Sequence, residues 1–129
     1  MVIDSSALIA ILLGEPGADG LIQAISTDGR RFMSALNLLE TAIVIHGRKG
    51  DPGHRELDQL LAITGMTVVD LTLEQVTLAR EAYRRFGKGY HPARLNLGDC
   101  CAYALARHMG EPLLFKGDDF SRTDIAPHG

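Results

Sequence analysis

The chain has 129 residues, a length that fits one domain around one hydrophobic core. Hydrophobic residues make up 46% of it and charged residues 22%, a balance that argues against disorder over the whole length. The longest unbroken apolar run, residues 7–13, is too short to cross a membrane. No basic segment precedes Asp4, as it would in a secretory signal, so the sequence predicts a cytoplasmic protein. The neighbouring Cys100 and Cys101 are then expected to be reduced.

Charge is distributed unevenly along the chain, whose formal net charge is −3. Residues 80–94 carry five basic side chains and one acidic one, a local charge of +4 that leaves −7 for the rest. Such a strip can meet an anionic polymer. It is also the usual composition of a solvated helix face, so charge alone leaves both interpretations open.

Short apolar segments alternate with helical patterns. In chain order we expect strands at 2–3, 31–34, 66–69 and 112–115, and helices at 7–13, 18–26, 35–49, 55–64, 72–86 and 97–109. The serines after Asp4 and the hydroxyl of Thr72 are good N-caps, and Gly110 is a common helix end. A turn at residues 50–53 is expected to separate two helices. This alternation predicts an α/β fold with a parallel sheet and helices on both faces.

Acidic residues follow the first and last predicted strands. In parallel α/β folds the active site lies beyond the carboxyl ends of the strands. Asp4 directly follows the first strand, and Asp118 and Asp119 follow the last one. Taken singly, each of them also fits as a helix cap or a turn residue.

Glu40 interrupts the apolar face of its predicted helix. Four side chains share that face and are expected to pack on the core: Leu36, Leu39, Ile43 and Val44. A carboxylate there costs several kcal/mol unless it is paired, protonated or metal-bound, and a position at the solvent-exposed rim is the alternative. Asp99 begins a later helix, either as a first-turn acid favoured by the helix dipole or as a member of one pocket with Asp4 and Glu40.

Considered together, the acids indicate a cation site more strongly than any one of them does alone. Two carboxylates about 4 Å apart repel by roughly 4 kcal/mol at an effective dielectric of about 20, so three or four of them converge only around cations. Hard oxygen ligands suit Mg²⁺ or Mn²⁺. The histidines show no close pair at ligand spacing, which argues against zinc. They are His46, His54, His91, His108 and His128.

Four segments resemble the motifs of PIN-domain proteins, specifically the VapC-type toxins of bacterial toxin–antitoxin pairs. Residues 1–8 are similar to the first motif and residues 38–42 to the second, while residues 95–100 and 113–120 resemble the third and fourth. The resemblance spans essentially the whole chain in the expected order. Each motif alone is weak, but the four together are specific.

The resemblance implies a single PIN-like nuclease domain over residues 1–129, with a three-layer α/β/α fold and a mainly parallel central sheet. By position, Asp4, Glu40 and Asp99 would bind Mg²⁺ or Mn²⁺ and catalyse RNA cleavage by a metal-activated water. Asp118 or Asp119 would be the fourth catalytic acid, with Asp119 slightly favoured by its spacing to the following Phe.

The resemblance also implies partners: an RNA substrate, a second copy of the chain, and a VapB-type antitoxin that neutralises a type II toxin. Candidate antitoxin-docking side chains are Leu8, Ile11, Leu36 and Leu39. The weaker RNA-contacting candidates are Ser6, Arg84, Arg85, Lys88, His91 and Arg94, with Tyr90 as a stacking side chain. Ser6 could instead hold the first carboxylate or a metal-bound water.

Other classes match less well. A phosphoaspartyl enzyme or receiver domain needs a second Asp close to the first, and Ser6 stands there. No histidine is placed to activate Ser5, Ser6 or Cys100 as a nucleophile. A catalytically inert PIN-like binding module remains the alternative, although retention of all the candidate acids speaks against it.

Overall fold

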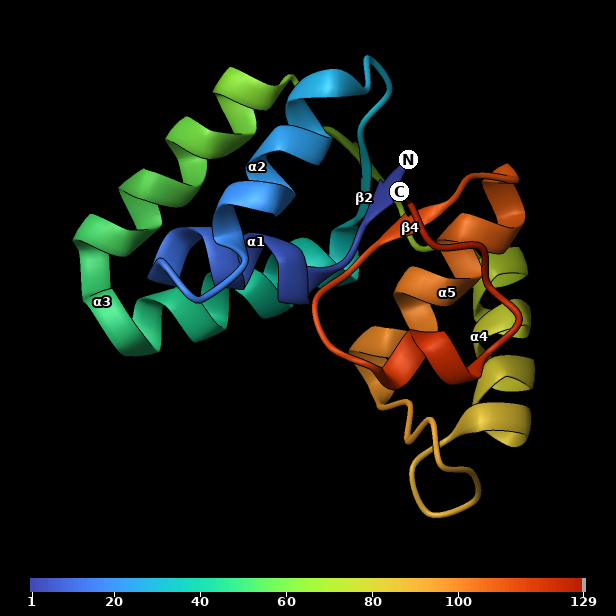
Figure 1. Ribbon diagram of the computed structural model, residues 1–129. Helices are drawn as coiled ribbons and strands as arrows, with labels where there is room; N and C mark the ends of the chain where they lie inside the picture. The colour runs from blue at the N-terminus through green and yellow to red at the C-terminus, as the bar shows by residue number, and fades with distance from the viewer. Residues whose placement is uncertain (129) are drawn as a thin grey trace.

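The computed structural model describes residues 1–128. The strands are β1 (Val2–Ile3), β2 (Phe32–Ser34), β3 (Thr67–Val69) and β4 (Leu113–Leu114). The helices are α1 (Ser5–Leu13), α2 (Ala18–Thr27), α3 (Ala35–Thr64), α4 (Leu73–Phe86), α5 (Leu97–Met109) and the 3₁₀ helix η1 (Asp119–Arg122), as Figure 1 shows. The α/β class and the alternation predicted from the sequence are confirmed.

The four strands form one parallel sheet in the order β3-β2-β1-β4. Val2 of β1 pairs with Phe32 on one side and with Leu113 on the other. Because all the strands run the same way, their carboxyl ends meet at one edge of the sheet. The acids that follow β1 and β4 therefore lie at the same edge.

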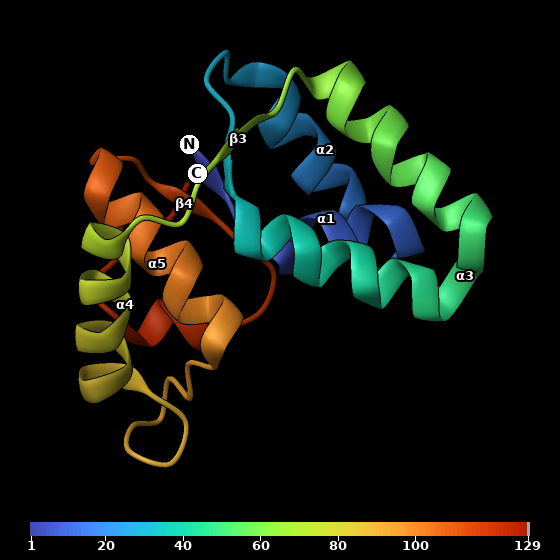
Figure 2. The same cartoon turned by 180° about the vertical axis from the view of Figure 1, so that it is seen from behind.

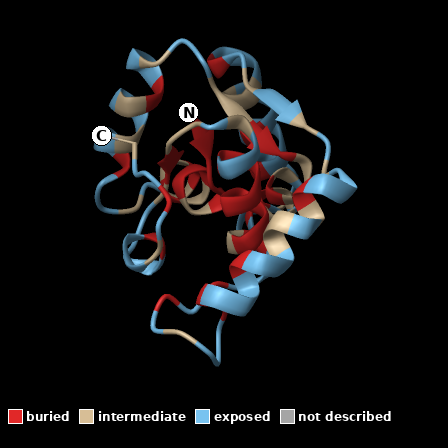
Figure 3. Ribbon diagram, turned by 90° about the vertical axis from the view of Figure 1, so that its right-hand side faces the viewer, coloured by how far each residue is buried: buried red, intermediate tan, exposed pale blue. Residues whose placement is uncertain are grey.

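Helices cover both faces of this sheet: α1, α2 and α3 lie on one side, and α4 and α5 on the other (Figures 1 and 2). Side chains alternate across the strands, as the pleat requires. Val2 and Leu113 pack in the cluster beneath α4 and α5, whereas Ile3 and Leu114 pack beneath α1 to α3. The buried residues concentrate at the centre of the molecule (Figure 3). The expected three-layer arrangement is confirmed.

Helix α3 differs from its sequence prediction in two ways. Residues 50–53 do not form a turn, because only Gly50 leaves the helical conformation (φ 63°, ψ −148°), and the helix resumes at once. Pro52 then lies in the first turn of the second half, where a missing N–H costs no hydrogen bond. The kink bends the helix without a loop, which glycine allows because it has no Cβ.

The second difference concerns the face of α3 that meets the core. Asn37, Thr41 and Ile45 are fully buried, whereas Leu39 and Ile43 are 60% and 64% exposed. The prediction that the leucine-rich stripe faces the core is therefore wrong. The sequence pattern located an apolar face, but that face points outward, and polar side chains occupy the inner one.

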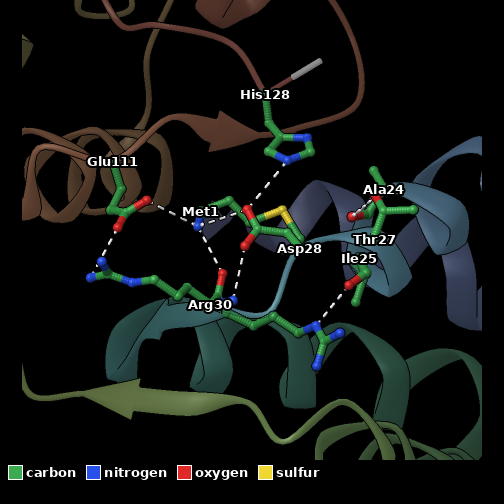
Figure 4. Close-up of polar contacts among 9 residues, drawn as sticks. Met1, Ala24, Ile25, Thr27, Asp28, Arg30, Glu111 and His128 are labelled. Atoms are coloured by element: carbon green, nitrogen blue, oxygen red, sulfur yellow. Dashed lines mark hydrogen bonds and ion pairs between the residues drawn. The ribbon is translucent and has the colours of Figure 1, made fainter.

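The sheet is anchored at the edge opposite the acids (Figure 4). The α-ammonium of Met1 donates to the backbone carbonyl of Arg30 at 2.8 Å and lies 3.1 Å from Glu111 and 3.4 Å from Asp28. His128 approaches the same Asp28 carboxylate at 3.4 Å. Because β1 is only two residues long, this anchor helps to fix the register that places the following acid at the other edge. Over residues 1–128, no helix has the length and apolar composition to span a bilayer.

Candidate active site

Asp4 is buried at the junction of β1 and α1, with 2% of its surface exposed. Its Oδ2 accepts a hydrogen bond of 3.0 Å from the backbone N–H of Ser6, so that Asp4 N-caps α1. Its Oδ1 is buried as well and has no hydrogen-bond partner among residues 1–128. Such an atom is rare in a folded protein and points to a missing partner.

Glu40 reaches the same edge from α3. The hydroxyl of Ser5 donates to Glu40 Oε1, and the side-chain amide of Asn37 lies 3.4 Å from the same oxygen. The carboxylate also lies against Gly98, where any Cβ would collide with it. Glu40 is half-buried, so its side chain is held by protein contacts and not simply extended into solvent.

Asp99 lies in the first turn of α5 and closes a reciprocal cap with Asn96. Asp99 Oδ2 accepts from the backbone N–H of Asn96 at 3.0 Å, and Asn96 Oδ1 accepts from the N–H of Asp99 at 2.9 Å. This capping box fixes the rotamer of Asp99. The sequence left two roles open for Asp99, a first-turn acid of its helix or a neighbour of the other acids. In the structure it caps the helix, and its charge also acts on Asp4.

The acids influence one another electrostatically. Burial, reinforced by the charges of Asp99 and Glu40, raises the pKa of Asp4 to about 7 despite the opposing hydrogen bonds from Ser6. Burial, together with the charges of Asp119 and Glu40, raises the pKa of Asp99 to about 6 although the Asn96 amide opposes it. Four carboxylates from four segments of the chain are therefore linked through their charges, and we refer to them as the acid cluster: Asp4, Glu40, Asp99 and Asp119.

The acid cluster fits a hard divalent cation by its chemistry. It offers only carboxylate oxygens, it includes the partnerless Oδ1 of Asp4, and its charges repel. In the described part of the chain, no three Asp, Glu, His or Cys side chains already stand close enough to hold a single ion. An ion would therefore draw the carboxylates together against their mutual repulsion, which adds to burial in raising the pKa values of Asp4 and Asp99.

The two candidates for the fourth acid differ in their surroundings. Asp119 shares a pocket of about 330 Å³ with Lys88, Arg94 and Asn96, and its charge contributes to the raised pKa of Asp99. Asp118 is the exposed residue before η1, and its backbone carbonyl accepts from Ser121 N. The surroundings favour Asp119.

The basic side chains of residues 80–94 differ in their contacts. Arg84 pairs with Glu81 at 2.8 Å, and Arg85 pairs with Asp124 at 3.2 Å. Lys88 and Arg94 instead line the pocket beside the acid cluster. Arg94 adopts a positive φ of 57°, a conformation that non-glycine residues rarely hold and that is frequent at functional sites.

The loop between α4 and α5 is well ordered by its own contacts. Lys88 N donates to the carbonyl of Leu95 at 2.9 Å, and the hydroxyl of Tyr83 donates to the carbonyl of Lys88 at 3.1 Å. Tyr90 packs edge-on against Tyr83 yet is 73% exposed, which leaves ring surface free for stacking. His91 accepts from Ala93 N through Nδ1 and stabilises the loop.

Some polar residues near the acids have structural contacts that the sequence did not reveal. Ser6 Oγ accepts from Lys116 N at 3.0 Å and so joins α1 to the segment after β4. Ser5, Asn37 and Gly98 surround Glu40 and were not predicted as site residues. The sequence shows that Asn37 precedes Glu40 by three residues, but it does not show that Asn37 is buried.

The fold is that of a PIN domain. The family model described as PIN domain matches residues 1–126, and the chain belongs to this family. Its curated relatives are VapC ribonucleases. The chain is 54% identical to Ribonuclease VapC of Mycolicibacterium smegmatis over 98% of both chains. It is 52% identical to Ribonuclease VapC30 of Mycobacterium tuberculosis, over 98% of this chain and 96% of the relative.

Solved structures share the fold at low sequence identity. VapC20 of Mycobacterium tuberculosis, described as a sarcin-ricin loop cleaving toxin, superposes with a TM-score of 0.79 at 19% identity, over 97% of this chain and 95% of that one. A toxin–antitoxin complex from Klebsiella pneumoniae gives a TM-score of 0.72 at 15% identity, over 95% and 92%. These likenesses establish the architecture independently of the sequence match.

Proposed function

We propose that the chain is a metal-dependent endoribonuclease and the toxin component of a type II toxin–antitoxin system, acting in the cytoplasm. The observation that carries the proposal is the acid cluster, in which burial and mutual repulsion raise the pKa values of Asp4 and Asp99. The relatives named as VapC ribonucleases support the same activity. An inert PIN-like module would have no need for such a destabilising cluster.

Asp4, Glu40 and Asp99 are the proposed ligands for Mg²⁺ or Mn²⁺, with Asp119 favoured over Asp118 as the fourth acid. When bound, the ion would stabilise charge on the scissile phosphate and favour attack by water. The Cys100 thiol, beside Asp99, is not a competing nucleophile. Burial and the charges of Asp99 and Cys101 raise the pKa of the Cys100 thiol to about 12, so it stays protonated and unreactive.

Lys88 and Arg94 are the proposed phosphate-binding side chains for RNA. They lie in one pocket with Asp119, and the next phosphate along a bound strand would fall within reach of positive charge. The exposed ring of Tyr90 is placed for base stacking. Arg84 and Arg85 would contribute less, because both are paired with acids.

A second copy of the chain is the proposed partner of the exposed apolar face. Leu39 and Ile43 of α3 and Leu97 of α5 are all at least 60% exposed, which is costly in a lone chain. An apolar groove of about 490 Å³ between α4 and α5 includes Leu97. It is lined by Leu71, Val76, Ala79, Arg80, Tyr83, Arg84, Leu97, Cys100 and Cys101.

A VapB-type antitoxin is the other proposed partner. Of the docking side chains expected from the sequence, Leu8 is fully buried and cannot contact a partner, which corrects that expectation. Ile11 and Leu36 are partly exposed and Leu39 is well exposed, so these three remain candidates. Co-purification of a small protein encoded next to the gene tests this assignment, and loss of binding on charge insertion at Ile11 would map it.

RNA cleavage by Asp99→Asn tests the proposed activity. The amide can still accept from Asn96 N and keep the cap, but it lacks the charge that a divalent ion needs. Cleavage with Mg²⁺ or Mn²⁺ should fall by at least about a hundredfold, as expected for loss of a catalytic metal ligand. Asp58→Asn, an exposed position on α3, is the matched control. Equal activity in both variants would refute the proposal.

A further inference from the structure

Asn37 is a fully buried amide on the inner face of α3, a helix that packs against both α1 and α5. Its Nδ2 lies 3.0 Å from Ser5 Oγ, 3.0 Å from the carbonyl oxygen of Gly98, and 3.4 Å from Glu40 Oε1. One side-chain amide therefore contacts α1, its own helix and α5.

Each of these three contacts is next to a member of the acid cluster. Ser5 directly follows Asp4, Gly98 directly precedes Asp99, and Glu40 is itself an acid of the cluster. The Asn37 amide thus lies at the centre of the three backbone segments that carry the proposed metal ligands. A shift of this amide would change the spacing of all three.

The orientation of the Asn37 amide is fixed by its surroundings. Rotation by 180° would place Oδ1 against the Gly98 carbonyl and the Glu40 carboxylate, which are both acceptors. The observed orientation instead leaves Oδ1 buried and with no partner within residues 1–128. A buried amide oxygen without a partner is unfavourable, so fold stability alone does not account for this residue.

Gly98 contributes by lacking a side chain. Any Cβ at this position would collide with both carboxylate oxygens of Glu40. The carboxylate therefore lies against the first turn of α5, while Ser5 and Asn37 donate to it. These contacts leave Glu40 a single well-defined position at the edge of the sheet.

We infer that Asn37 is a positioning residue: its amide, together with Ser5 and Gly98, holds the three segments that carry Asp4, Glu40 and Asp99 next to one another, so that a divalent ion can draw the three carboxylates together. The inference rests on the proposed function, because it assigns Asn37 a role in that same site. It predicts that loss of the amide weakens metal binding and turnover while RNA binding stays intact. RNA binding depends instead on Lys88 and Arg94, which Asn37 does not contact.

The test compares Asn37→Leu with Thr41→Val. Leu is close to Asn in size and removes both ends of the amide. Thr41 lies one turn further on the same buried face, and its hydroxyl donates only to the backbone carbonyl of Asn37 at 2.8 Å, so Thr41→Val controls for loss of a buried polar group. Mn²⁺ dissociation constants are measured by calorimetry on the intact chain, and kcat and KM for RNA cleavage are measured in parallel.

For Asn37→Leu we expect at least about a tenfold weaker Mn²⁺ affinity and a similar loss in kcat, as is usual for residues that hold metal ligands in place. The KM for RNA should stay within about twofold of wild type. Thr41→Val should match wild type in all three quantities. If Asn37→Leu does not fold, Asn37→Ser, which retains one donor, carries the test with an intermediate loss of Mn²⁺ affinity. Wild-type Mn²⁺ affinity in the folded Asn37 variant, or an equal loss in Thr41→Val, would overturn the inference. If the wild-type chain itself neither binds Mn²⁺ nor cleaves RNA, the proposed function fails instead.

Discussion

Burial, reinforced by the charge of Asp99 on the first turn of α5, raises the pKa of Asp4, which lies at the end of β1 near the start of the chain. Asp4 follows a strand of the parallel sheet, and Glu40 of α3 contacts the neighbours of both acids, Ser5 and Gly98. Because of these acids, the stability of the folded chain without a metal ion should change with pH in an unusual direction.

Without divalent ions, the apo chain should become less stable as pH rises from about 4 to about 7. Asp4 and Asp99 have folded pKa values of about 7 and about 6, above the ordinary value of 3.8. In that window the folded state holds more protons than the unfolded state, so the free energy of unfolding falls as pH rises. Melting temperatures in EDTA should therefore be higher at pH 5 than at pH 8.

Asp124→Asn is a control for which we expect the opposite effect on stability. Partial burial raises the pKa of Asp124, but the hydrogen bond from Tyr103 and the charges of Arg85 and Arg107 outweigh it and lower that pKa. Removing this carboxylate should destabilise the chain at pH 7, whereas removing one from the acid cluster should not. A melting temperature that rises steadily from pH 5 to pH 8 in EDTA would contradict the account.

Lys88→Ala with Arg94→Ala should weaken RNA binding and reduce its salt dependence. Each lost phosphate contact on a single strand lowers the slope of log K against log salt by about 0.7, so the pair should lower it by roughly 1.4. The matched control is Arg84→Ala with Arg85→Ala, since those side chains are already paired with acids. Binding titrations at several salt concentrations measure the slopes, and equal slopes in both double variants would rule out the pocket as the phosphate site.

Leu39→Asp with Ile43→Asp should convert a two-chain assembly into single chains. Both side chains are exposed on the outward face of α3, so charge there disrupts an interface without disturbing the core. Ile63→Asp is the control, because Ile63 is 82% exposed on the other half of α3. Sedimentation measures the mass, and a wild type that sediments as a single chain would exclude the proposed dimer.

Cys100→Ala should retain RNA cleavage, since its protonated thiol takes no part in the reaction. The side chain is buried, so the substitution should lower stability by about 1 kcal/mol, as small core deletions do. Cleavage assays below the melting temperature separate the two effects. A variant that folds but does not cleave would point to a thiol mechanism.

Much of the architecture was predictable because its signals are local. Thr72 and Gly110 mark helix ends through hydrogen bonds to nearby backbone groups, and the structure has helix boundaries at these positions. The prediction that the serines after Asp4 are N-caps is wrong, because Asp4 itself caps α1, and the hydroxyls of Ser5 and Ser6 bond to distant segments. The placement of acids after strands followed from the parallel topology. The kink at Gly50 was missed because a glycine–proline segment equally fits a loop.

The remaining features depend on contacts between distant segments. The apolar stripe of α3 faces outward, because a periodic pattern gives the existence of an apolar face but not the partner that covers it. The contacts of Asn37 with Ser5 and Gly98 join three helices, so no local pattern reveals them. For the same reason, the ion pair between Arg85 and Asp124 could not be predicted from the distribution of charge along the sequence.

The shared metal site is tested most directly by four melting curves, for wild type and Asp4→Asn, each in EDTA and in Mg²⁺. Asn is as good an N-cap as Asp, so the substitution keeps the start of α1 while removing one repelling charge. In EDTA, Asp4→Asn should melt higher than wild type by about 4 °C or more, the shift expected for each kcal/mol in a domain of this size. Mg²⁺ should stabilise wild type, because it binds only the folded state, and should stabilise Asp4→Asn much less. If Asp4→Asn melts lower than wild type in EDTA and responds equally to Mg²⁺, Asp4 is only a helix cap and the acid cluster is not a metal site.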